Sequence, residues 1–130
     1  MIDHFGINCA DLDAATTFYD TVLATLGHTR LKEFSDDQGH GAIGYGTTKP
    51  DFWISRFSDD LGPNREMHLA FSAPDAATVR AFVEAAVGLG AEVLHEPRHF
   101  PEYHDHYYGG FVRDPDGNNV EAVCHRVAPE

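Results

Sequence analysis

Apolar and polar positions follow the same order in two parts of the chain, where a short alternating stretch precedes a helical one. Residues 4–18 read HFGINCADLDAATTF, and residues 68–82 read HLAFSAPDAATVRAF. Three pairs of identical residues recur at one fixed spacing without a gap: His4 with His68, Asp11 with Asp75, and Phe18 with Phe82. Three matches at one spacing, in the same order of elements, indicate an internal duplication.

Each copy predicts one amphipathic helix after its strand. The first helix begins at Asp11, a good N-cap, and ends at Gly27. The second begins at Asp75 and ends at Gly88 and Gly90. Their apolar residues recur at helical spacing: Leu12, Ala15, Tyr19, Val22, Leu23 and Leu26 in the first helix, and Val79, Phe82, Val83, Ala86 and Val87 in the second.

The other alternating stretches predict a strand before each helix and three strands after it. Asp116-Gly117 is a strong turn signal before the last strand. The predicted strands are 3–9, 28–34, 40–46 and 51–57 in the first half, and 67–72, 91–95, 107–113 and 119–124 in the second. The pattern is βαβββ twice, an α+β arrangement, in one domain over 1–130 with module one at about 1–60 and module two at about 65–126.

The alternation of side chains along a strand separates an apolar face from a face that carries polar residues. In the first strand Phe5, Ile7 and Cys9 share the apolar face, and His4 lies on the other. His68 and Glu121 are placed in the same way in the second half. We expect the apolar faces to pack on the two helices, so the opposite faces carry these three polar residues beside small ones that leave room for a ligand.

A carboxylate in an apolar strand needs a partner, because burying an unpaired carboxylate is costly. Two neutral imidazoles and one carboxylate suit a divalent ion, and three protein ligands leave positions for water or substrate. We therefore predict that His4, His68 and Glu121 bind one divalent metal ion. The alternative is that both histidines are ordinary hydrogen-bonded strand residues and that the glutamate pairs with Arg113 or Arg126.

The chain resembles the vicinal oxygen chelate superfamily, which includes glyoxalase I, extradiol dioxygenases, fosfomycin-resistance transferases and bleomycin-binding proteins. The resemblance covers essentially the whole chain. It rests on the opening IDHFGI, the following DLDAATTFYDTVLATLG, the second-half MHLAFSAPD and the closing DPDGNNVEAV. Together these motifs are specific for the superfamily, and none of them is specific for a reaction.

The resemblance implies that the two modules form an open, cup-like eight-stranded barrel around a divalent metal, whose ligands carry over to His4, His68 and Glu121. Zinc, nickel, manganese, iron and cobalt all accept these donors. The resemblance also implies a homodimer. Glyoxalase I has a fourth ligand, Glu or Gln, late in its first module, where this chain reads PDFWISRF. Asp51 could replace that ligand or cap the strand, and this departure argues against ordinary glyoxalase I activity.

The segment HFPEYHDHYYGGF, residues 99–111, is the most unusual in the chain. Its glycine pair would let a ligand or another backbone approach closely. We predict a lid over the metal, with His104 and Tyr108 joining Glu121 as catalytic residues. The predicted substrate-binding residues are aromatic: Tyr45, Trp53, Tyr103 and Tyr107. The alternative is a loop of aromatic residues packed over the barrel rim, with the two strand aromatics in the core.

Composition narrows the range of partners and locations. The chain has 9 Lys and Arg against 21 Asp and Glu, a formal net charge of −12, which disfavours nucleic-acid binding. No apolar run is long enough to span a membrane, and the first residues show no signal peptide, so we expect a cytoplasmic protein. Cys9 and Cys124 have no CxxC neighbour and are expected to be buried rather than zinc ligands.

Three functional hypotheses follow. The first, which we favour, is a metal-dependent enzyme (isomerase, lyase, transferase or ring-cleaving) that acts on a small oxygen-rich substrate chelated to the metal. The second is a bleomycin-resistance-like protein that sequesters an aromatic or cationic ligand without catalysis, for which three converging metal ligands would have no chemical use. The third is a metal-free structural relative that retains these residues by ancestry.

Overall fold

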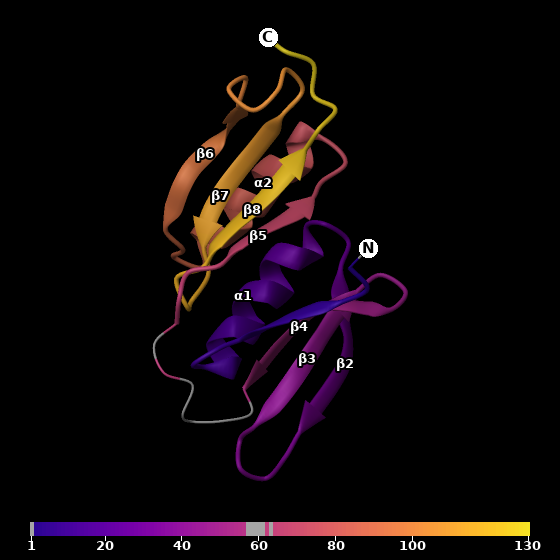
Figure 1. Ribbon diagram of the computed structural model, residues 1–130, viewed down its shortest axis with the longest axis vertical. Helices are drawn as coiled ribbons and strands as arrows, with labels where there is room; N and C mark the ends of the chain where they lie inside the picture. Colours follow the sequence, from indigo (N-terminus) through magenta and orange to yellow (C-terminus); the bar gives the residue numbers. More distant parts are fainter. Residues whose placement is uncertain (1, 57–61, 63) are drawn as a thin grey trace. The chain divides into compact units, whose positions relative to one another are not determined.

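The structure is a computed structural model that describes residues 2–56, 62 and 64–130. The chain divides between Asn64 and Arg65 into two compact units, which we call module one and module two. Over the described residues, each module has the predicted order of one strand, one helix and three strands (Figure 1). The predicted α+β class and the duplicated βαβββ order are therefore confirmed.

The helices and strands lie close to the predicted ranges. In module one they are β1 (Phe5–Asn8), α1 (Leu12–Ala24), β2 (Thr29–Ser35), β3 (Gly41–Gly46) and β4 (Pro50–Arg56). In module two they are β5 (His68–Ser72), α2 (Ala76–Gly88), β6 (Val93–His99), β7 (Tyr108–Arg113) and β8 (Asn119–Cys124). The observed and predicted ranges differ most at the end of β6, which was predicted to end at residue 95 and ends at His99. Its pairing with β7 continues beyond the apolar alternation. Neither helix in the described part of the chain is long and apolar enough to cross a membrane.

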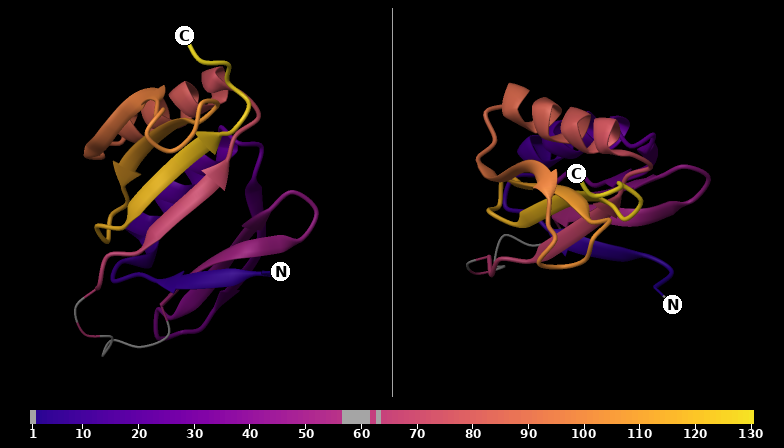
Figure 2. Two further views of the ribbon diagram at one scale, coloured as in Figure 1. Left: turned by 45° about the horizontal axis from the view of Figure 1, so that its top comes forward. Right: turned by 90° about the horizontal axis from the view of Figure 1, so that it is seen from above.

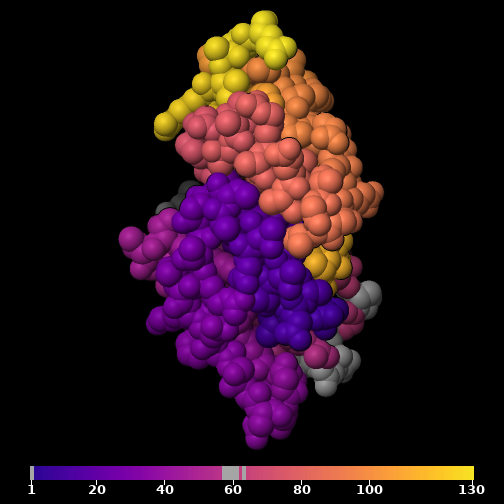
Figure 3. Space-filling view, turned by 180° about the vertical axis from the view of Figure 1, so that it is seen from behind, coloured from indigo at the N-terminus to yellow at the C-terminus, as the bar shows by residue number. Residues whose placement is uncertain are grey.

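Each module contains a four-stranded sheet in which the first and last strands are neighbours. Over the described residues the strand orders are β1-β4-β3-β2 and β5-β8-β7-β6. The pairs β1–β4 and β5–β8 are parallel. In module two, α2 packs on β6, β7 and β8. It covers the sheet face that points away from the viewer in Figure 1, Figure 2 shows it as a separate layer, and it forms part of the surface in Figure 3.

Both helices begin where the sequence predicts. The Asp11 carboxylate accepts a hydrogen bond from the Ala14 N–H (3.0 Å), and the Asp75 carboxylate accepts one from the Thr78 N–H (2.8 Å). Val87, predicted to be part of the apolar stripe of α2, is exposed because its side chain points about 90° away from the middle of the buried stripe. That buried stripe consists of Val79, Phe82, Val83 and Ala86.

The DPDGN sequence forms a structural turn that fixes the start of β8. Asp114 is buried, and its carboxylate accepts hydrogen bonds from the N–H groups of Asp116 (2.9 Å) and Asn118 (2.8 Å). The Asn118 amide donates to the same carboxylate (2.9 Å), and its oxygen accepts from the Met67 N–H (3.0 Å) just before β5. Gly117 takes the φ of 85° that the turn requires. The turn therefore holds β5 and β8 in one fixed register.

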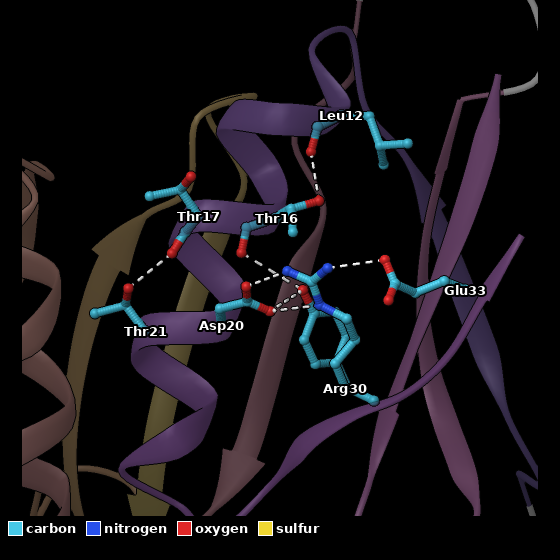
Figure 4. Close-up of polar contacts among 8 residues, drawn as sticks. Leu12, Thr16, Thr17, Asp20, Thr21, Arg30 and Glu33 are labelled. Atoms are coloured by element: carbon cyan, nitrogen blue, oxygen red, sulfur yellow. Dashed lines mark hydrogen bonds and ion pairs between the residues drawn. The ribbon is translucent and has the colours of Figure 1, made fainter. Parts of the chain in front are cut away.

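A polar cluster holds β2 against α1 in module one (Figure 4). Arg30 on β2 donates to both oxygens of the Asp20 carboxylate on α1, and also to Glu33 Oε1 (2.9 Å). The Tyr45 hydroxyl donates to Asp20 Oδ1 (2.9 Å), although this tyrosine is only 1% exposed. Burial, followed by the contact with Asp20, raises the pKa of Tyr45. The Asp20 carboxylate therefore accepts hydrogen bonds from both the buried Tyr45 phenol and the Arg30 guanidinium.

We expect Asp20→Ala to lower the free energy of unfolding by about 1–2 kcal/mol, because it leaves the Tyr45 hydroxyl and the Arg30 guanidinium without their shared acceptor. Chemical denaturation measures this change. Glu84→Ala, which removes an exposed carboxylate from α2, should alter stability by less than about 0.5 kcal/mol. Full additivity of Asp20→Ala and Tyr45→Phe in a double-mutant cycle would show that the two side chains do not support one another.

Candidate metal centre

Glu121 lies on the face of the module-two sheet opposite α2. It is paired across the sheet with Ala70 of β5 and Phe111 of β7. Its neighbours along β8, Val120 and Ala122, belong to the opposite, helix-covered face and are fully buried. Glu121 is itself only 1% exposed. A carboxylate this deeply buried is stable in its charged form only with suitable partners.

Two side chains in the described part of the chain contact the Glu121 carboxylate. The Tyr107 hydroxyl donates a hydrogen bond to Oε1, and His68 Nε2 lies 3.1 Å from Oε2. The alternative prediction of an arginine partner is wrong. Arg113 forms its ion pairs with two other carboxylates, and Arg126 makes no contact with the glutamate among the described residues. The partners of Glu121 are therefore a phenol and an imidazole.

The hydrogen bonds of His68 determine which ring nitrogen carries the proton. Nδ1 lies 3.2 Å from the backbone carbonyl oxygen of Asn119, which can only accept, so Nδ1 is protonated and donates. In the neutral ring Nε2 then carries a lone pair, and this nitrogen faces the Glu121 carboxylate. Two lone pairs at 3.1 Å repel each other unless a proton or a cation lies between them.

The spacing of these two atoms fits a shared cation. Metal–ligand distances of about 2.1 Å and ligand–metal–ligand angles of roughly 90–110° put two adjacent ligand atoms about 3.0–3.4 Å apart. The distance of 3.1 Å between His68 Nε2 and Glu121 Oε2 lies in that range. A second hydrogen bond like the one to Asn119 is what orients metal-bound histidines. Within the described part of module two, no third His, Cys, Asp or Glu joins the pair.

Burial changes the protonation equilibrium of this pair. Desolvation raises the pKa of the Glu121 carboxyl, and the Tyr107 hydrogen bond and the nearby His68 lower it only in part. Desolvation, followed by the contact with Glu121, also raises the pKa of Tyr107, which therefore stays a protonated donor. The carboxylate is consequently under-compensated at neutral pH, and a bound cation would supply the missing charge.

His4 precedes β1 in module one and has the same tautomer as His68. Its Nδ1 donates to Asp3 Oδ1 at 2.7 Å, so in the neutral ring Nε2 carries a lone pair, which has no hydrogen bond to the described residues. Lys49 Nζ lies 2.8 Å from the other Asp3 oxygen. The Lys49 hydrogen bond is the largest cause that lowers the pKa of Asp3 to about 2, so the carboxylate stays charged and holds the imidazole. The role of His4 as a metal ligand stays a prediction.

The segment between β6 and β7 folds back over the Glu121 face. Phe100 is 1% exposed, and its ring lies 5.4 Å from Phe111, 5.4 Å from Tyr103 and 5.8 Å from Tyr107. Tyr103 stacks on the outside and is 60% exposed. The segment is therefore an ordered aromatic cover, and Tyr107 is its member that contacts the carboxylate.

Two predicted site residues lie on helix-covered faces instead. Tyr108 is buried, and its hydroxyl accepts a hydrogen bond from Arg80 of α2 (3.3 Å), so its predicted catalytic role beside Glu121 is wrong. Tyr45 lies in the module-one core and donates to Asp20, so it does not line the opposite face. Consecutive strand residues point to opposite faces, so only one of Tyr107 and Tyr108 can point to the glutamate. Two adjacent tyrosines do not show which one it is.

His104 pairs with His125, a residue to which the sequence pattern gave no role. His104 Nε2 lies 2.9 Å from His125 Nδ1, and both rings contact Tyr107 edge-on. The His106 N–H donates to His104 Nδ1 (3.1 Å), so neutral His104 carries its proton on Nε2 and shares it with the second imidazole. This tautomer is the reverse of that of His68. It suits proton exchange rather than metal binding.

Module one has an aromatic residue at the position equivalent to Glu121. Gly6 corresponds to Ala70 in the repeat, and it pairs with Trp53 as the alanine pairs with the glutamate. Asp51, the suggested fourth ligand, is exposed and lies two residues earlier on β4. The fourth-ligand position of the repeat is therefore occupied by an indole rather than a carboxylate.

Trp53 and Phe34 form an aromatic surface on the face of the module-one sheet opposite its core. Their rings stack with centroids 5.9 Å apart, and Phe34 is 56% exposed. The indole lies over Gly44, where a Cβ would come within 2.8 Å of the ring. The predicted substrate-binding role of Trp53 is compatible with this position, since a flat ring can stack there.

Gly109 and Gly110 leave room for different neighbours on the two faces of β7. A Cβ at Gly109 would come within 2.9 Å of Glu121 Oε1 and 3.2 Å of the Tyr107 ring. A Cβ at Gly110 would come within 2.6 Å of Val83 on α2. The first glycine therefore makes space for the carboxylate and its phenol, and the second lets the helix pack closely.

The model of the Glyoxalase/Bleomycin resistance protein/Dioxygenase superfamily matches residues 1–122. The chain belongs to this superfamily. Among solved structures, a glyoxalase/bleomycin resistance protein from Albidiferax ferrireducens T118 is 26% identical with a TM-score of 0.74, over 93% of this chain and 95% of that chain. The resemblance predicted from the sequence motifs is therefore confirmed.

Two more distant solved structures share the superfamily fold. A lactoylglutathione lyase from Agrobacterium tumefaciens is 22% identical with a TM-score of 0.65, over 95% of this chain and 92% of that chain. The fosfomycin resistance protein FosX from Listeria monocytogenes, complexed with Mn(II) and sulfate ion, is 17% identical with a TM-score of 0.67, over 95% and 91% of the two chains. No curated protein matches the chain.

We expect Gly109→Ala to lower the free energy of unfolding of this superfamily member by about 1–3 kcal/mol, because the added methyl group displaces the Glu121 carboxylate or Tyr107. Thermal or urea denaturation checks this. Gly88→Ala is the matched control, since a Cβ there meets nothing within 4 Å and the residue ends α2. The control should be neutral or slightly stabilising. Equal effects of the two substitutions would contradict the packing described for Gly109.

We expect Glu121→Gln to stabilise the metal-free protein at neutral pH. The amide keeps the oxygen that accepts from Tyr107 and adds an N–H that can donate to Nε2 of a neutral His68 ring. Because burial raises the folded-state pKa of Glu121, the ionised carboxylate is destabilising. This penalty is absent below the unfolded pKa of about 4.3 and is fully present above the folded one. Denaturation curves should therefore converge at acid pH, and parallel pH profiles would refute this account.

Proposed function

We propose that this superfamily member is a divalent-metal-dependent enzyme that acts on a small, oxygen-rich substrate chelated to the metal. One observation carries the proposal: both ring nitrogens of His68 face oxygens that act as acceptors, Asn119 O and, at 3.1 Å, a buried carboxylate oxygen of Glu121. That contact is unfavourable without a shared proton or cation, and its length suits two ligands of one ion.

His68 and Glu121 would hold the ion, and the sequence prediction adds His4 as a third ligand. The hydrogen bond from His4 Nδ1 to Asp3 supports this role, because it leaves Nε2 free. Trp53 at the glutamate-equivalent position of module one favours three protein ligands over the four of glyoxalase I. When bound, a divalent ion supplies a Lewis acid that polarises the oxygens of a substrate.

Tyr107 determines which oxygen of Glu121 remains available. Its hydroxyl occupies Oε1, so Oε2 is the atom turned towards His68. The glutamate would therefore contact an ion through one oxygen and a hydrogen-bond donor through the other. Beside Tyr107, His104 Nε2 donates a hydrogen bond to His125 Nδ1 over 2.9 Å. This pair would exchange protons with a bound substrate. These groups fit isomerase, lyase, transferase and ring-cleaving chemistry.

A second function, binding of an aromatic ligand without catalysis, is favoured by the stacked Trp53 and Phe34 rings of module one. Phe34 is 56% exposed, so a planar ligand could stack on it. This function has no need of the His68–Glu121 pair. Metal content therefore distinguishes the two functions.

We expect the protein, purified without a polyhistidine tag, to hold about one equivalent of a divalent transition metal per chain. Element-resolved mass spectrometry after dialysis measures the content and identifies the metal. Glu121→Gln and His68→Gln should lose the metal, because each removes one of two adjacent donor atoms. His4→Gln should also lose it if the predicted third ligand is correct.

The matched control is His40→Gln, which removes an imidazole that lies 3.2 Å from the Asp36 carboxylate in module one. It should keep the full metal content. Wild-type protein that contains no metal and takes up none when supplied with zinc, nickel, manganese, iron or cobalt would exclude the proposed enzyme. That result would favour the aromatic-ligand function.

A further inference from the structure

Module two contains a cavity of about 390 Å³ at the carboxyl ends of β5 and β8. These two strands run parallel and end side by side (Figure 1). The cavity is lined by 72–74, which follow β5 into α2, and by 123–126, which end β8 and begin the C-terminal segment.

The polar lining of this cavity is cationic, although the protein is strongly acidic. Arg126 and His125 line it, Ser72 adds a hydroxyl, and none of its described lining residues is Asp or Glu. The whole chain has 21 Asp and Glu against 9 Lys and Arg. In the same module Arg98 and Arg113 form ion pairs with carboxylates, whereas Arg126 forms none with the described residues. An exposed arginine without a carboxylate partner in the described part of the chain therefore faces a space that a ligand can fill.

The cavity adjoins the proposed metal centre through His125. This ring meets Tyr107 edge-on with centroids 5.1 Å apart, and the Tyr107 hydroxyl holds the Glu121 carboxylate. Val123, also in the lining, is opposite Gly109 in the sheet register and lies on the same face as the glutamate. The Tyr107–His125 contact therefore places the cavity next to the group that holds the Glu121 carboxylate.

We propose that this cavity binds an anionic group, a carboxylate or a phosphate, of the substrate whose oxygens chelate the metal. The fork of N–H donors on Arg126 matches either anion. His125 Nδ1 accepts from His104, so in the neutral ring Nε2 carries a proton and can donate. The Ser72 hydroxyl is a further donor. The identity of the anion as part of a substrate rests on the proposed function, but the anion site itself needs no metal.

Other classes of ligand fit this lining less well. A cation would meet a guanidinium and an imidazole without a carboxylate to offset its charge. An apolar group would desolvate Arg126 without giving it a partner. Asp75, which follows the lining residue Pro74, accepts at Oδ1 from the Thr78 N–H and hydroxyl at 2.8 Å each, and it has no hydrogen bond to Arg126, His125 or Ser72.

The test is a titration of the metal-free protein with inorganic phosphate at constant ionic strength, followed by proton–nitrogen NMR. We expect saturable shifts of backbone amides in 72–73 and 124–126. Arg126→Gln should weaken the affinity about tenfold or more, because it removes charge-assisted hydrogen bonds. Arg65→Gln is the matched control, since it removes the same charge from an exposed residue before β5 and should change the affinity less than about twofold.

A parallel titration with acetate distinguishes the two anion classes, and the anion that binds more tightly identifies the class. Shifts that do not saturate with either anion, or an affinity that Arg126→Gln leaves unchanged, would overturn the anion site. The metal measurement is independent of this outcome. One equivalent of metal without anion binding would keep the proposed enzyme and remove this inference, whereas anion binding without metal uptake would keep the site and remove the proposed enzyme.

Discussion

The burial of the Glu121 carboxylate is the constraint on which the rest of module two depends. A charged group that is 1% exposed needs compensation from its neighbours, and several features of the chain supply part of it. Gly109 leaves out a side chain where one would collide with Oε1, and Tyr107 fills the remaining space with a hydroxyl donor. The DPDGN turn fixes the register of β5 against β8, which brings His68 to the other oxygen. All of these features lie around the two carboxylate oxygens of Glu121.

The histidines of this protein differ in the direction of the hydrogen bond at Nδ1, and this direction sets their tautomer. His4 and His68 both donate from Nδ1 to an oxygen that accepts, so in the neutral ring Nε2 carries the lone pair. His104 accepts at Nδ1 from a backbone N–H, so its proton lies on Nε2, beside His125. The first arrangement suits a metal ligand, and the second suits a proton shared between two rings. The backbone around each ring therefore decides its chemistry.

The duplication explains why the two modules share a fold and differ in chemistry. Both use a parallel pair of their first and last strands, with a small residue, Gly6 or Ala70, opposite the key side chain. That side chain is an indole in module one and a carboxylate in module two. The backbone requirement is the same in both, because a small residue leaves room on the sheet face. The difference in side chain gives one copy an aromatic surface and the other a histidine–carboxylate pair.

Sequence alone determined the elements of this protein, because local patterns set them. Aspartate caps, apolar stripes and two-residue alternation placed both helices and all the predicted strands of the described residues. They also placed Glu121 and His68 on one face of the second module, because strand alternation needs no tertiary information. The opening IDHFGI and DLDAATTFYDTVLATLG, the second-half MHLAFSAPD and the closing DPDGNNVEAV together indicated the superfamily.

Only the tertiary structure decided which neighbours these residues have. Tyr107 rather than Tyr108 reaches the glutamate because the exact start of β7 decides the face, and two adjacent tyrosines carry no signal for that. Tyr45 is in the core because an aspartate from α1 meets its hydroxyl. His125 lies beside His104 through a contact between a loop and a strand end. Protonation of each imidazole depends on such long-range contacts, which no local pattern encodes.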